Sequence, residues 1–451
     1  MRRFALLVLL LSPLLAFAQG RGSRAPWGIG QSRPEDLQIT LVTFGPGPEI
    51  ISWFGHSALV VEDTRLGQRR LYNYGMFGFE KPGMLVKFAM GRLEFWVEDT
   101  PYVVPTFRFY ASEQRDVILQ LLNLSPAQRA QLAQALDENV QPQNRYYLYH
   151  HYFDNCSTRP RDMIDRATGG VLSAIGAQPA RMTLREHTRR HTDYFPPMSV
   201  LLDFLMNDEI DQPITRYQEA FLPAELMHQV DEAKVTLPDG TVAPLVAEKI
   251  TWFEGKRPKP PETPPKYGPA LLAIGLLLGA PAVLWAVWYR RSRGRAPRIL
   301  LGVHNVLVGL VLGLPGTVLL LMGTLTEHTV THHNENLLLA NPLTLLAVPF
   351  GIGLMRDRAK SSRALRAIWV LLAGMGVLEL LLKALPWFDQ DNWRIIALVL
   401  PISLGFAAAS VVYEASRHAE RSNREDDRAP PAPRRAPGDS LTSTANVRAS
   451  R

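Results

Sequence analysis

Five long apolar stretches in the second half of the chain restrict its fold more than any other feature of the sequence. They cover residues 269–289, 299–323, 337–355, 367–386 and 395–413. The first stretch carries no charged residue, and about 20 apolar residues suffice for a helix to cross the hydrocarbon core of a bilayer. The sequence therefore predicts an all-α bundle of five transmembrane helices in this half of the chain.

The charged residues that flank these stretches predict how the bundle is oriented. Arginine and lysine are concentrated in the loops 290–298 and 356–366, whereas the loops 324–336 and 387–393 contain neither. Such an excess of Lys and Arg is typical of cytoplasmic loops. We therefore expect the C-terminus in the cytoplasm, and we attribute the net charge of +7 to membrane topology and not to a nucleic-acid partner.

The first half of the chain is expected to be exported. Residues 1–18 combine two arginines, an apolar run and the tripeptide Ala16-Phe17-Ala18, which is the pattern of a secretory signal peptide. An uncleaved anchor is the alternative, and either one would export the next domain. The expected order is an exported domain (19–254), a Pro-rich tether (255–268), the bundle (269–415) and a disordered tail (416–451). This organisation predicts a multi-pass protein of the inner membrane with a periplasmic N-terminal domain.

Local patterns predict an α+β fold for the exported domain. Strands are expected at 37–44, 57–62 and 70–74, with a further extended segment at 101–110, a short aromatic segment at 146–149 and a terminal hairpin around Asp239-Gly240. Ser125 with Gln128 predicts a capped helix that reaches about residue 140. Ser112 is expected to cap a shorter helix, and another helix is expected from near Cys156 to Gly169-Gly170.

Cys156 is the single cysteine of the chain, so an internal disulfide and a multi-cysteine metal site are both excluded. It follows Asp154 and Asn155 at the expected start of a helix. Backbone N–H groups and the positive end of the helix dipole favour a thiolate at such a position, and they can also stabilise an oxyanion. The residues alone leave two alternatives, a nucleophile and an inert core thiol.

His56 is the candidate base for this thiol. It follows Gly55 and begins the apolar run Ser57-Ala58-Leu59-Val60-Val61, which places an imidazole at the mouth of an expected strand. The adjacent expected strand supplies Asn73, whose amide can orient the ring through its other nitrogen. A histidine satisfied by hydrogen bonds within the core is the alternative.

These segments carry a resemblance to known enzymes. The GHSALVV strand at 55–61, the LYNYG strand at 71–75 and the Asn-Cys-Ser helix start at 155–157 resemble the permuted NlpC/P60 papain-like fold, in which histidine precedes cysteine. More closely, residues 36–255 resemble the Lnb-type N-terminal periplasmic domain. The stretches 207–215 and 221–223 and the loop 332–338 with Asn341-Pro342 are similar to that family too.

The resemblance implies that Cys156 is a nucleophile and His56 a base, whereas the role of Asn73 is our inference from papain-like geometry. It also implies a lipoprotein intramolecular acyltransferase, which moves an acyl chain from the glyceryl group of a lipoprotein to its N-terminal amine. A thioester on Cys156 is then the expected intermediate, with direct general-base catalysis as the alternative. No cofactor is expected.

Other polar residues are candidates for contact with a substrate. They are Tyr149, His150, His151, His333 and Asn336. Adjacent strand residues point to opposite faces, so only one of His150 and His151 is expected to face the site. The outer loop with His328, His332, His333 and Glu335 has metal-ligand residue types, but we expect it to dock on the exported domain or on a substrate head group and assign no metal. Glu379 and Lys383 are expected to pair on one helix face, and His304-Asn305 to join helices.

Three functions are consistent with these features. The first is a thiol-dependent acyltransferase for a membrane lipid or lipoprotein at the outer face of the inner membrane. The second is a tethered NlpC/P60-like cell-wall peptidase or amidase, which needs only one anchor and leaves four spans unexplained. The third is a non-catalytic membrane sensor or scaffold, which lacks a recognisable cytoplasmic output module. The sequence leaves the oligomeric state open.

Overall fold

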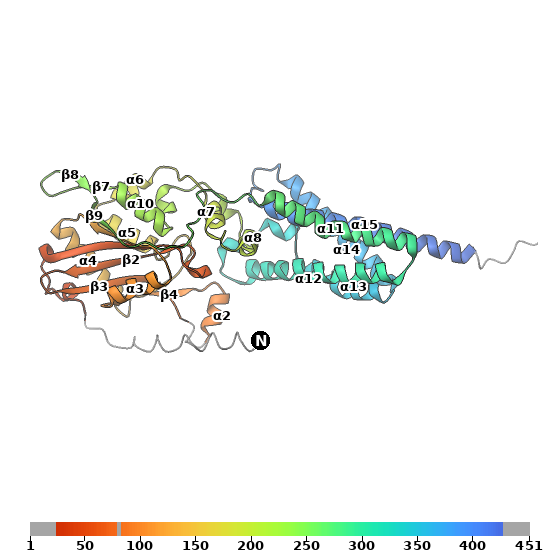
Figure 1. Cartoon of the computed structure of the whole chain (residues 1–451), viewed down its shortest axis with the longest axis horizontal. Helices are drawn as coiled ribbons and strands as arrows, with labels where there is room; N and C mark the ends of the chain where they lie inside the picture. Colours follow the sequence, from red (N-terminus) through yellow and green to blue (C-terminus); the bar gives the residue numbers. More distant parts are fainter. Residues whose placement is uncertain (1–23, 79–82, 427–451) are drawn as a thin grey trace, which may run out of the picture.

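The computed structural model describes residues 24–78 and 83–426 of the protein. The expected signal peptide and the last part of the expected tail lie outside these residues. In the described part, a mixed sheet-and-helix unit is followed by an elongated helical bundle, and the two lie end to end (Figure 1).

A seven-stranded antiparallel sheet forms the centre of the first unit, in the order β6-β4-β3-β2-β1-β5-β9. Its strands are β1 (Leu37–Phe44), β2 (His56–Asp63), β3 (Gln68–Met76), β4 (Glu94–Thr100), β5 (Val117–Leu122), β6 (Tyr146–Leu148) and β9 (Val246–Phe253). The first three strands occupy the three strand positions expected from the sequence. A separate hairpin of β7 (Lys234–Thr236) and β8 (Val242–Pro244) confirms the expected turn at Asp239-Gly240.

Helices cover both faces of the sheet, because alternate residues of each central strand point to opposite sides. Leu41 and Leu59 belong to a core with α4 (Pro126–Asn139), α5 (Thr158–Ala167) and α10 (Pro223–Glu232). Val42 and Val60 pack on the other side with α3 (Val103–Ser112). The remaining elements are η1 (Pro26–Ile29), η2 (Pro34–Asp36), η3 (Ile50–Ser52), α2 (Met84–Ala89), α6 (Val171–Gly176), α7 (Leu184–His191), α8 (Pro196–Leu205), η4 (Asp208–Asp211) and α9 (Arg216–Glu219).

The helix α4 confirms one sequence signal in detail. The Ser125 hydroxyl accepts a hydrogen bond from the Gln128 backbone, and the Gln128 side chain accepts one from the Ser125 backbone. Two neighbouring predictions are wrong. Residues 101–110 are mostly helical, because Val103 and Phe107, four residues apart, are both buried against the sheet. Ser112 ends α3 and does not cap a new helix; its hydroxyl donates to the Phe109 carbonyl.

Four helices of the second unit are long and apolar enough to cross a membrane. They are α11 (Gly268–Ser292), α12 (Arg295–Leu325), α14 (Ala359–Leu382) and α15 (Trp393–Asp426). The expected third span is not a continuous helix. Residues 337–355 fall in the end of η6 (Glu335–Leu338), in η7 (Pro342–Leu346) and in α13 (Ala347–Met355). These follow η5 (Thr329–Thr331), and the chain bends by 54° between residues 338 and 342. Pro342 lacks the N–H that a continuous helix needs, and Asn341 caps the following turn.

Polar contacts inside the bundle agree with the expected pairing. Lys383 approaches Glu379 to 4.0 Å and also pairs with Glu335. Asn305 of α12 accepts a hydrogen bond of 2.7 Å from Trp369 of α14, which confirms its role in joining helices. The segment from 416 to 426 was expected to be disordered, but it continues α15. Arg417 pairs there with Asp357, which ties the helix end to the α13–α14 connection.

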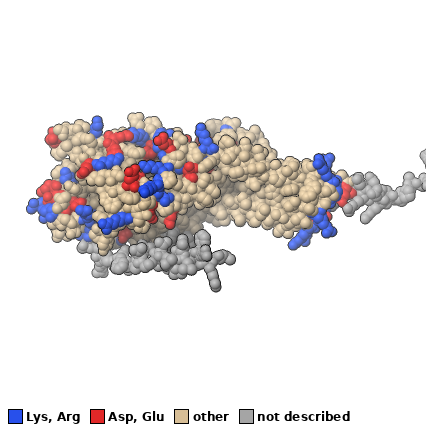
Figure 2. Space-filling model, in the orientation of Figure 1, with Lys and Arg blue, Asp and Glu red and all other residues tan. Residues whose placement is uncertain are grey.

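The charged surface of the bundle is uneven. Figure 2 shows Lys and Arg gathered at the end of the bundle far from the sheet, with a largely uncharged surface between that end and the sheet unit. The basic end contains the α11–α12 and α13–α14 connections. This uncharged band is what a membrane-embedded region requires.

Buried charges fix the sheet unit to the bundle. Asp203 of α8 is 3% exposed and accepts hydrogen bonds from Arg189 of α7 at 2.9 and 3.0 Å and from Arg394 of α15 at 3.1 Å. Arg189 also pairs with Asp391, in the α14–α15 connection, at 2.5 Å. Partners on both units share one buried network, so the junction is part of the folded core.

The outer loop between α12 and α13 and the Pro-rich tether close the same junction. The Asn207 backbone donates to Val330 at 2.6 Å, and its amide donates to the His332 carbonyl at 2.9 Å. This confirms that the loop docks on the exported unit. The tether lies along this unit as well, because Arg190 donates to the Pro261 carbonyl at 2.6 Å and Tyr194 to the Pro258 carbonyl at 2.6 Å. The sheet unit is thereby held close to the bundle.

Candidate functional site

Cys156 lies on the turn that leads into α5. The side chain of Asn155 organises this turn, because its Oδ1 accepts hydrogen bonds from the backbone N–H groups of Ser157 (2.7 Å) and Thr158 (2.9 Å). The Asn155 amide donates to the carbonyls of His151 (2.6 Å) and Phe221 (3.0 Å). The helix therefore begins after the cysteine, and Asn155 anchors the turn to two other segments.

The thiol lies against the ends of two neighbouring strands. A Cβ at Gly75 of β3 would lie 3.3 Å from the Cβ of Cys156, and the backbone of Ser57 on β2 hydrogen-bonds to the sulfur. Ser57 follows His56, and Gly75 lies two residues after Asn73. The turn thus brings Cys156 to the part of the sheet that carries both expected partners.

His56 begins β2 and forms a short hydrogen bond to Asn73 on β3. Its Nε2 lies 2.5 Å from Asn73 Oδ1. The Asn73 amide also hydrogen-bonds to Tyr110, which leaves Oδ1 as the acceptor for the imidazole. His56 therefore carries its proton on Nε2, and Nδ1 has the lone pair that a base requires. The preceding Gly55 has φ of 83°, and a Cβ there would lie 2.9 Å from the Phe44 carbonyl oxygen, so only glycine fits without displacement.

Burial keeps both reactive groups neutral. Desolvation raises the pKa of the Cys156 thiol to about 11, although backbone hydrogen bonds and the charge of Arg115 act to lower it. Desolvation lowers the pKa of His56 to about 4, against the hydrogen bond to Asn73, which raises it. At neutral pH the resting state is a thiol beside a neutral imidazole. The cysteine keeps partial solvent exposure, so a reagent can reach it.

Arg115 supplies a buried positive charge to this site. It is 4% exposed, its Nε donates to the Gly45 carbonyl at 2.7 Å, and its guanidinium lies 4.5 Å from the centre of the Tyr110 ring. Its charge lowers the pKa of both Cys156 and His56. Its Nη2 has no hydrogen-bond partner among the described residues. Such a donor favours negative charge that develops on nearby atoms.

The other expected site residues next to Cys156 have distinct positions. Tyr149 is close enough for the cysteine to raise the pKa of its hydroxyl, after the larger effect of burial. His150 and His151 lie in a turn and not on a strand, so strand alternation does not apply to them. His150 Nδ1 accepts backbone hydrogen bonds within this turn, and His151 packs edge-on against Phe54 at 4.4 Å.

The outer-loop candidates lie at the junction of the two units. Asn336 is fully buried, its amide donates to the Phe204 carbonyl at 2.9 Å, and its Oδ1 accepts from Asn392 at 3.0 Å. These bonds use its polar atoms within the protein, which contradicts the expected contact with substrate. His333 is exposed on the same loop, with a left-handed backbone (φ of 50°). The polar loop residues are used for docking, and no His or acidic residues in this loop group as metal ligands in the part of the chain that the structure describes.

Several residues that shape the site have no local sequence signal. Tyr110 lies on α3 and Arg115 lies in the connection between α3 and β5. Only the tertiary fold brings these two residues to the site. His191 of α7 hydrogen-bonds to the Trp53 carbonyl at 3.0 Å and so supports the loop before His56. Only Asn155 has a sequence signal, because Asn is common in turns, where its side chain accepts hydrogen bonds from backbone N–H groups that follow it.

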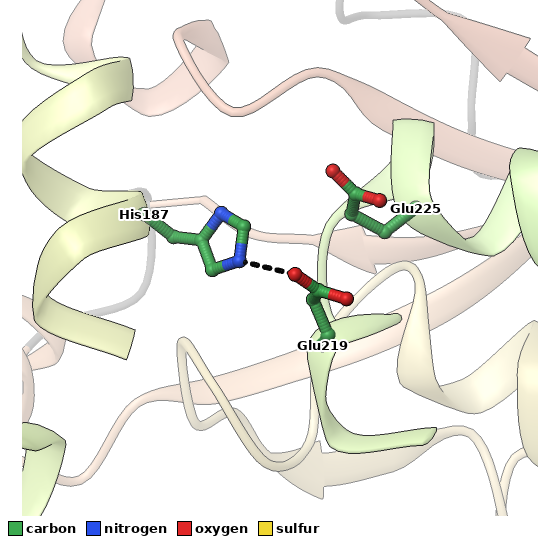
Figure 3. Close-up of side chains that lie close together, drawn as sticks. All are labelled: His187, Glu219 and Glu225. Atoms are coloured by element: carbon green, nitrogen blue, oxygen red, sulfur yellow. Dashed lines mark hydrogen bonds and ion pairs between the residues drawn. The ribbon is translucent and has the colours of Figure 1, made fainter. Parts of the chain in front are cut away.

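His187, Glu219 and Glu225 form a second cluster of ionisable groups, with ligand-type atoms within 4.8 Å of one another (Figure 3). His187 Nε2 lies 2.8 Å from Glu219, and its Nδ1 faces the guanidinium of Arg190 at 3.1 Å. Burial alone would raise the pKa of Glu225, but hydrogen bonds to His228 and Arg181 and the charge of Arg181 lower it to about 2. Both nitrogens of His187 are engaged by other side chains of the protein, so this cluster joins α7, α9 and α10.

The comparisons with known proteins agree with this architecture. Residues 23–190 match the Lnb N-terminal periplasmic domain, and residues 268–414 match the Lnb transmembrane domain. The chain matches no curated protein and no solved structure. The first match contains Cys156, His56 and Asn73 with six of the seven strands of the sheet, β9 lying beyond it, and the second contains the bundle up to Glu414. The chain therefore belongs to the Lnb family, as a multi-pass inner-membrane protein with a periplasmic N-terminal domain.

Proposed function

We propose that the protein is a thiol-dependent acyltransferase that acts on a lipid or lipoprotein at the periplasmic face of the inner membrane. The observation that carries this proposal is the hydrogen bond between His56 Nε2 and Asn73 Oδ1 beside a cysteine that contacts the backbone of Ser57. A thiol, an imidazole that can accept its proton and an amide that orients the imidazole are the parts of a papain-like site. On this basis we assign the exported unit to the permuted NlpC/P60 type.

The first half-reaction forms a thioester. His56 Nδ1 takes the proton of the Cys156 thiol as the sulfur attacks the ester carbonyl of an acylated substrate. The C=O bond opens to a tetrahedral oxyanion, which the Arg115 charge stabilises. The oxyanion collapses and expels the substrate alkoxide, which receives the proton from His56. The products are an acylated Cys156 and a free hydroxyl on the donor.

The second half-reaction returns the enzyme to its resting state. An amine attacks the thioester carbonyl and gives up one proton to His56. The tetrahedral intermediate then expels the Cys156 sulfur, which regains that proton, and an amide is released. The N-terminal amine of a lipoprotein is the acceptor that the family resemblance implies.

The orientation of the bundle belongs to the same proposal. The basic end, with the loops 290–298 and 356–366, lies in the cytoplasm together with the C-terminus. The sheet unit then lies on the periplasmic side, next to the outer ends of the spans. A substrate held in the membrane by its acyl chains can reach Cys156 without leaving the bilayer.

Mass spectrometry of lipoprotein N-termini tests the proposal. Cells that express the protein are compared with cells that express Cys156→Ala or His56→Ala, with Lys249→Ala, on an exposed part of β9, as the matched control. We expect N-acylation to be lost in the first two and kept in the control. Unchanged N-acylation in both site variants would refute the proposal. Release of peptide from purified cell wall by the protein would instead favour an amidase.

A further inference from the structure

The short helix α2 exposes apolar side chains next to the membrane-embedded bundle. Val86 is 65% exposed, and Phe88 and Met90 are exposed as well. Lys87 lies within this apolar group and Arg92 follows it, both with exposed side chains. Exposed apolar residues combined with basic ones are typical of segments that lie in the interfacial region of a membrane.

The structure ties α2 to the outer end of a membrane-spanning helix. The Glu327 backbone donates to the Met90 carbonyl at 2.8 Å, and Arg92 pairs with the Glu327 carboxylate at 2.7 Å. The ring of His328 hydrogen-bonds to the backbone of Phe88 and Ala89. Figure 1 shows α2 on the side of the sheet unit that faces the bundle. The helix is therefore held at a fixed height above the bundle.

The length of α12 sets that height relative to the bilayer. This helix has 31 residues, which corresponds to about 46 Å at 1.5 Å per residue. A bilayer with its headgroup regions is about 40–45 Å thick. Because the basic start of α12 lies at one surface, its end at Leu325 lies at the level of the opposite headgroups. Glu327 and His328, which hold α2, follow Leu325 by two and three residues. The exposed residues of α2 therefore lie at the level of these headgroups too.

A small hollow lies behind α2. It is lined by Phe77, Gly78, Phe88, Arg92, Leu93, Glu94 and Phe95. Phe95 contacts Phe77 with ring centres 5.1 Å apart and stacks on Tyr149 at 4.2 Å. Tyr149 lies within electrostatic range of Cys156. Aromatic side chains thus continue from the exposed face of α2 to the neighbourhood of the thiol.

We propose that α2 rests in the outer leaflet and that the aromatic side chains behind it guide an acyl chain from the bilayer to Cys156. The occupant is the acyl chain of a membrane phospholipid, because the exposed apolar side chains lie at headgroup height. The position of α2 in the leaflet stands without the acyltransferase function, whereas the guiding role rests on it.

Spin labelling tests the position of α2 without any catalysis. Cys156→Ser removes the only cysteine, and one cysteine is then introduced at Val86 or at Val242, which is 67% exposed on β8 at the far end of the sheet unit. The labelled full-length protein is reconstituted in vesicles of phosphatidylethanolamine and phosphatidylglycerol. We expect the label at 86 to relax faster with oxygen than with a water-soluble nickel chelate, and the label at 242 to show the reverse. Equal preference of the two labels for the chelate would overturn the proposal.

Two thiol probes test the guiding role. One is a maleimide carried on the end of a phospholipid acyl chain, and the other is a small water-soluble maleimide. We expect Val86→Asp to slow the reaction of Cys156 with the lipid probe at least fivefold and to leave the soluble probe unchanged, whereas Val242→Asp changes neither. Equal rates with the lipid probe in both variants, or equal slowing with both probes, would overturn the guiding role. Absence of acyl transfer by the wild-type protein, with the spin-label result intact, would refute the proposed function and leave the position of α2 in the leaflet standing.

Discussion

Cys156 is expected to react slowly with a small alkylating reagent at neutral pH. Burial raises the pKa of the thiol from its ordinary value of 9.0 to about 11. Two pKa units reduce the thiolate fraction about 100-fold at any pH well below both values, because each unit is a tenfold change in the ionisation ratio. The thiolate is the species that reacts, so the alkylation rate should fall in the same proportion.

The measurement is the rate of carbamidomethylation by iodoacetamide between pH 6 and pH 10, followed by intact-protein mass spectrometry. Since the chain has one cysteine, the added mass reports on Cys156 alone. We expect the rate to rise about tenfold per pH unit across this range. It should stay about 100-fold below that of an unstructured cysteine peptide up to about pH 8, and the difference should narrow to about tenfold at pH 10, where the peptide thiol is mostly ionised. Arg115→Gln removes a charge that lowers the thiol pKa, so it should slow the reaction further.

The control is Arg69→Gln, which removes an arginine from an exposed pair with Glu62 on β2 and β3. It should leave the rate unchanged at every pH. A rate that is already constant between pH 6 and pH 8 would refute the reasoning, because it would require a thiolate paired with a protonated His56 in the resting state. That result would replace general-base activation by a preformed ion pair.

Three further predictions concern stability. Asp203→Asn removes the carboxylate shared by buried arginines and should lower the free energy of unfolding by about 3–5 kcal/mol. The control Glu62→Gln, at an exposed pair, should lower it by about 1 kcal/mol or less. Similar midpoints in denaturant titrations of the two variants would contradict this prediction. Asn155→Ala should cost about 1–3 kcal/mol, because two backbone N–H groups lose their acceptor, and an unchanged thermal midpoint would contradict it. Burial lowers the pKa of His56 to about 4 and of His191 to about 3, so the unfolded state binds protons that the folded state does not. Stability should therefore fall as pH drops below about 6.5, and a midpoint independent of pH between 4 and 6.5 would refute this.

Local signals in the sequence are enough to predict the parts that the site stands on. The apolar run in residues 37–44 predicts β1, and the Ser125–Gln128 capping box predicts the start of α4. The position of the single cysteine before a helix makes Cys156 the candidate nucleophile. The short bond between His56 and Asn73 agrees with the expected pair. These features depend on residues that are close in sequence or on the adjacent strands of one sheet.

Contacts between distant segments are beyond the reach of such signals. Arg189 and Asp391 are separated by 202 residues, and no pattern in either segment indicates the other. The charge of Arg115 acts on Cys156 only because β5 and α5 are brought to the same region of the sheet unit. The helix α3 differs from the extended segment expected there. Its aromatic and β-branched residues suit a strand, but burial of Val103 with Phe107 favours the helix.

The junction between the two units has a consequence for the proposed reaction. Acyl transfer from a membrane substrate needs the thiol at a constant distance from the bilayer. The network around Asp203 and the docking of the outer loop on Asn207 supply that constraint. A sheet unit on a free tether would sample many heights above the membrane and would meet its substrate less often.

Detection of an acyl group on Cys156 tests the central claim most directly. The purified protein in phospholipid vesicles is incubated with a synthetic diacylglyceryl lipopeptide whose N-terminal amine is blocked, so that the second half-reaction cannot occur. We expect an added mass of one acyl chain on Cys156 that neutral hydroxylamine removes, and we expect His56→Ala to reduce its formation at least 100-fold. An unmodified cysteine after prolonged incubation, under conditions in which the unblocked lipopeptide is N-acylated, would contradict the thioester mechanism.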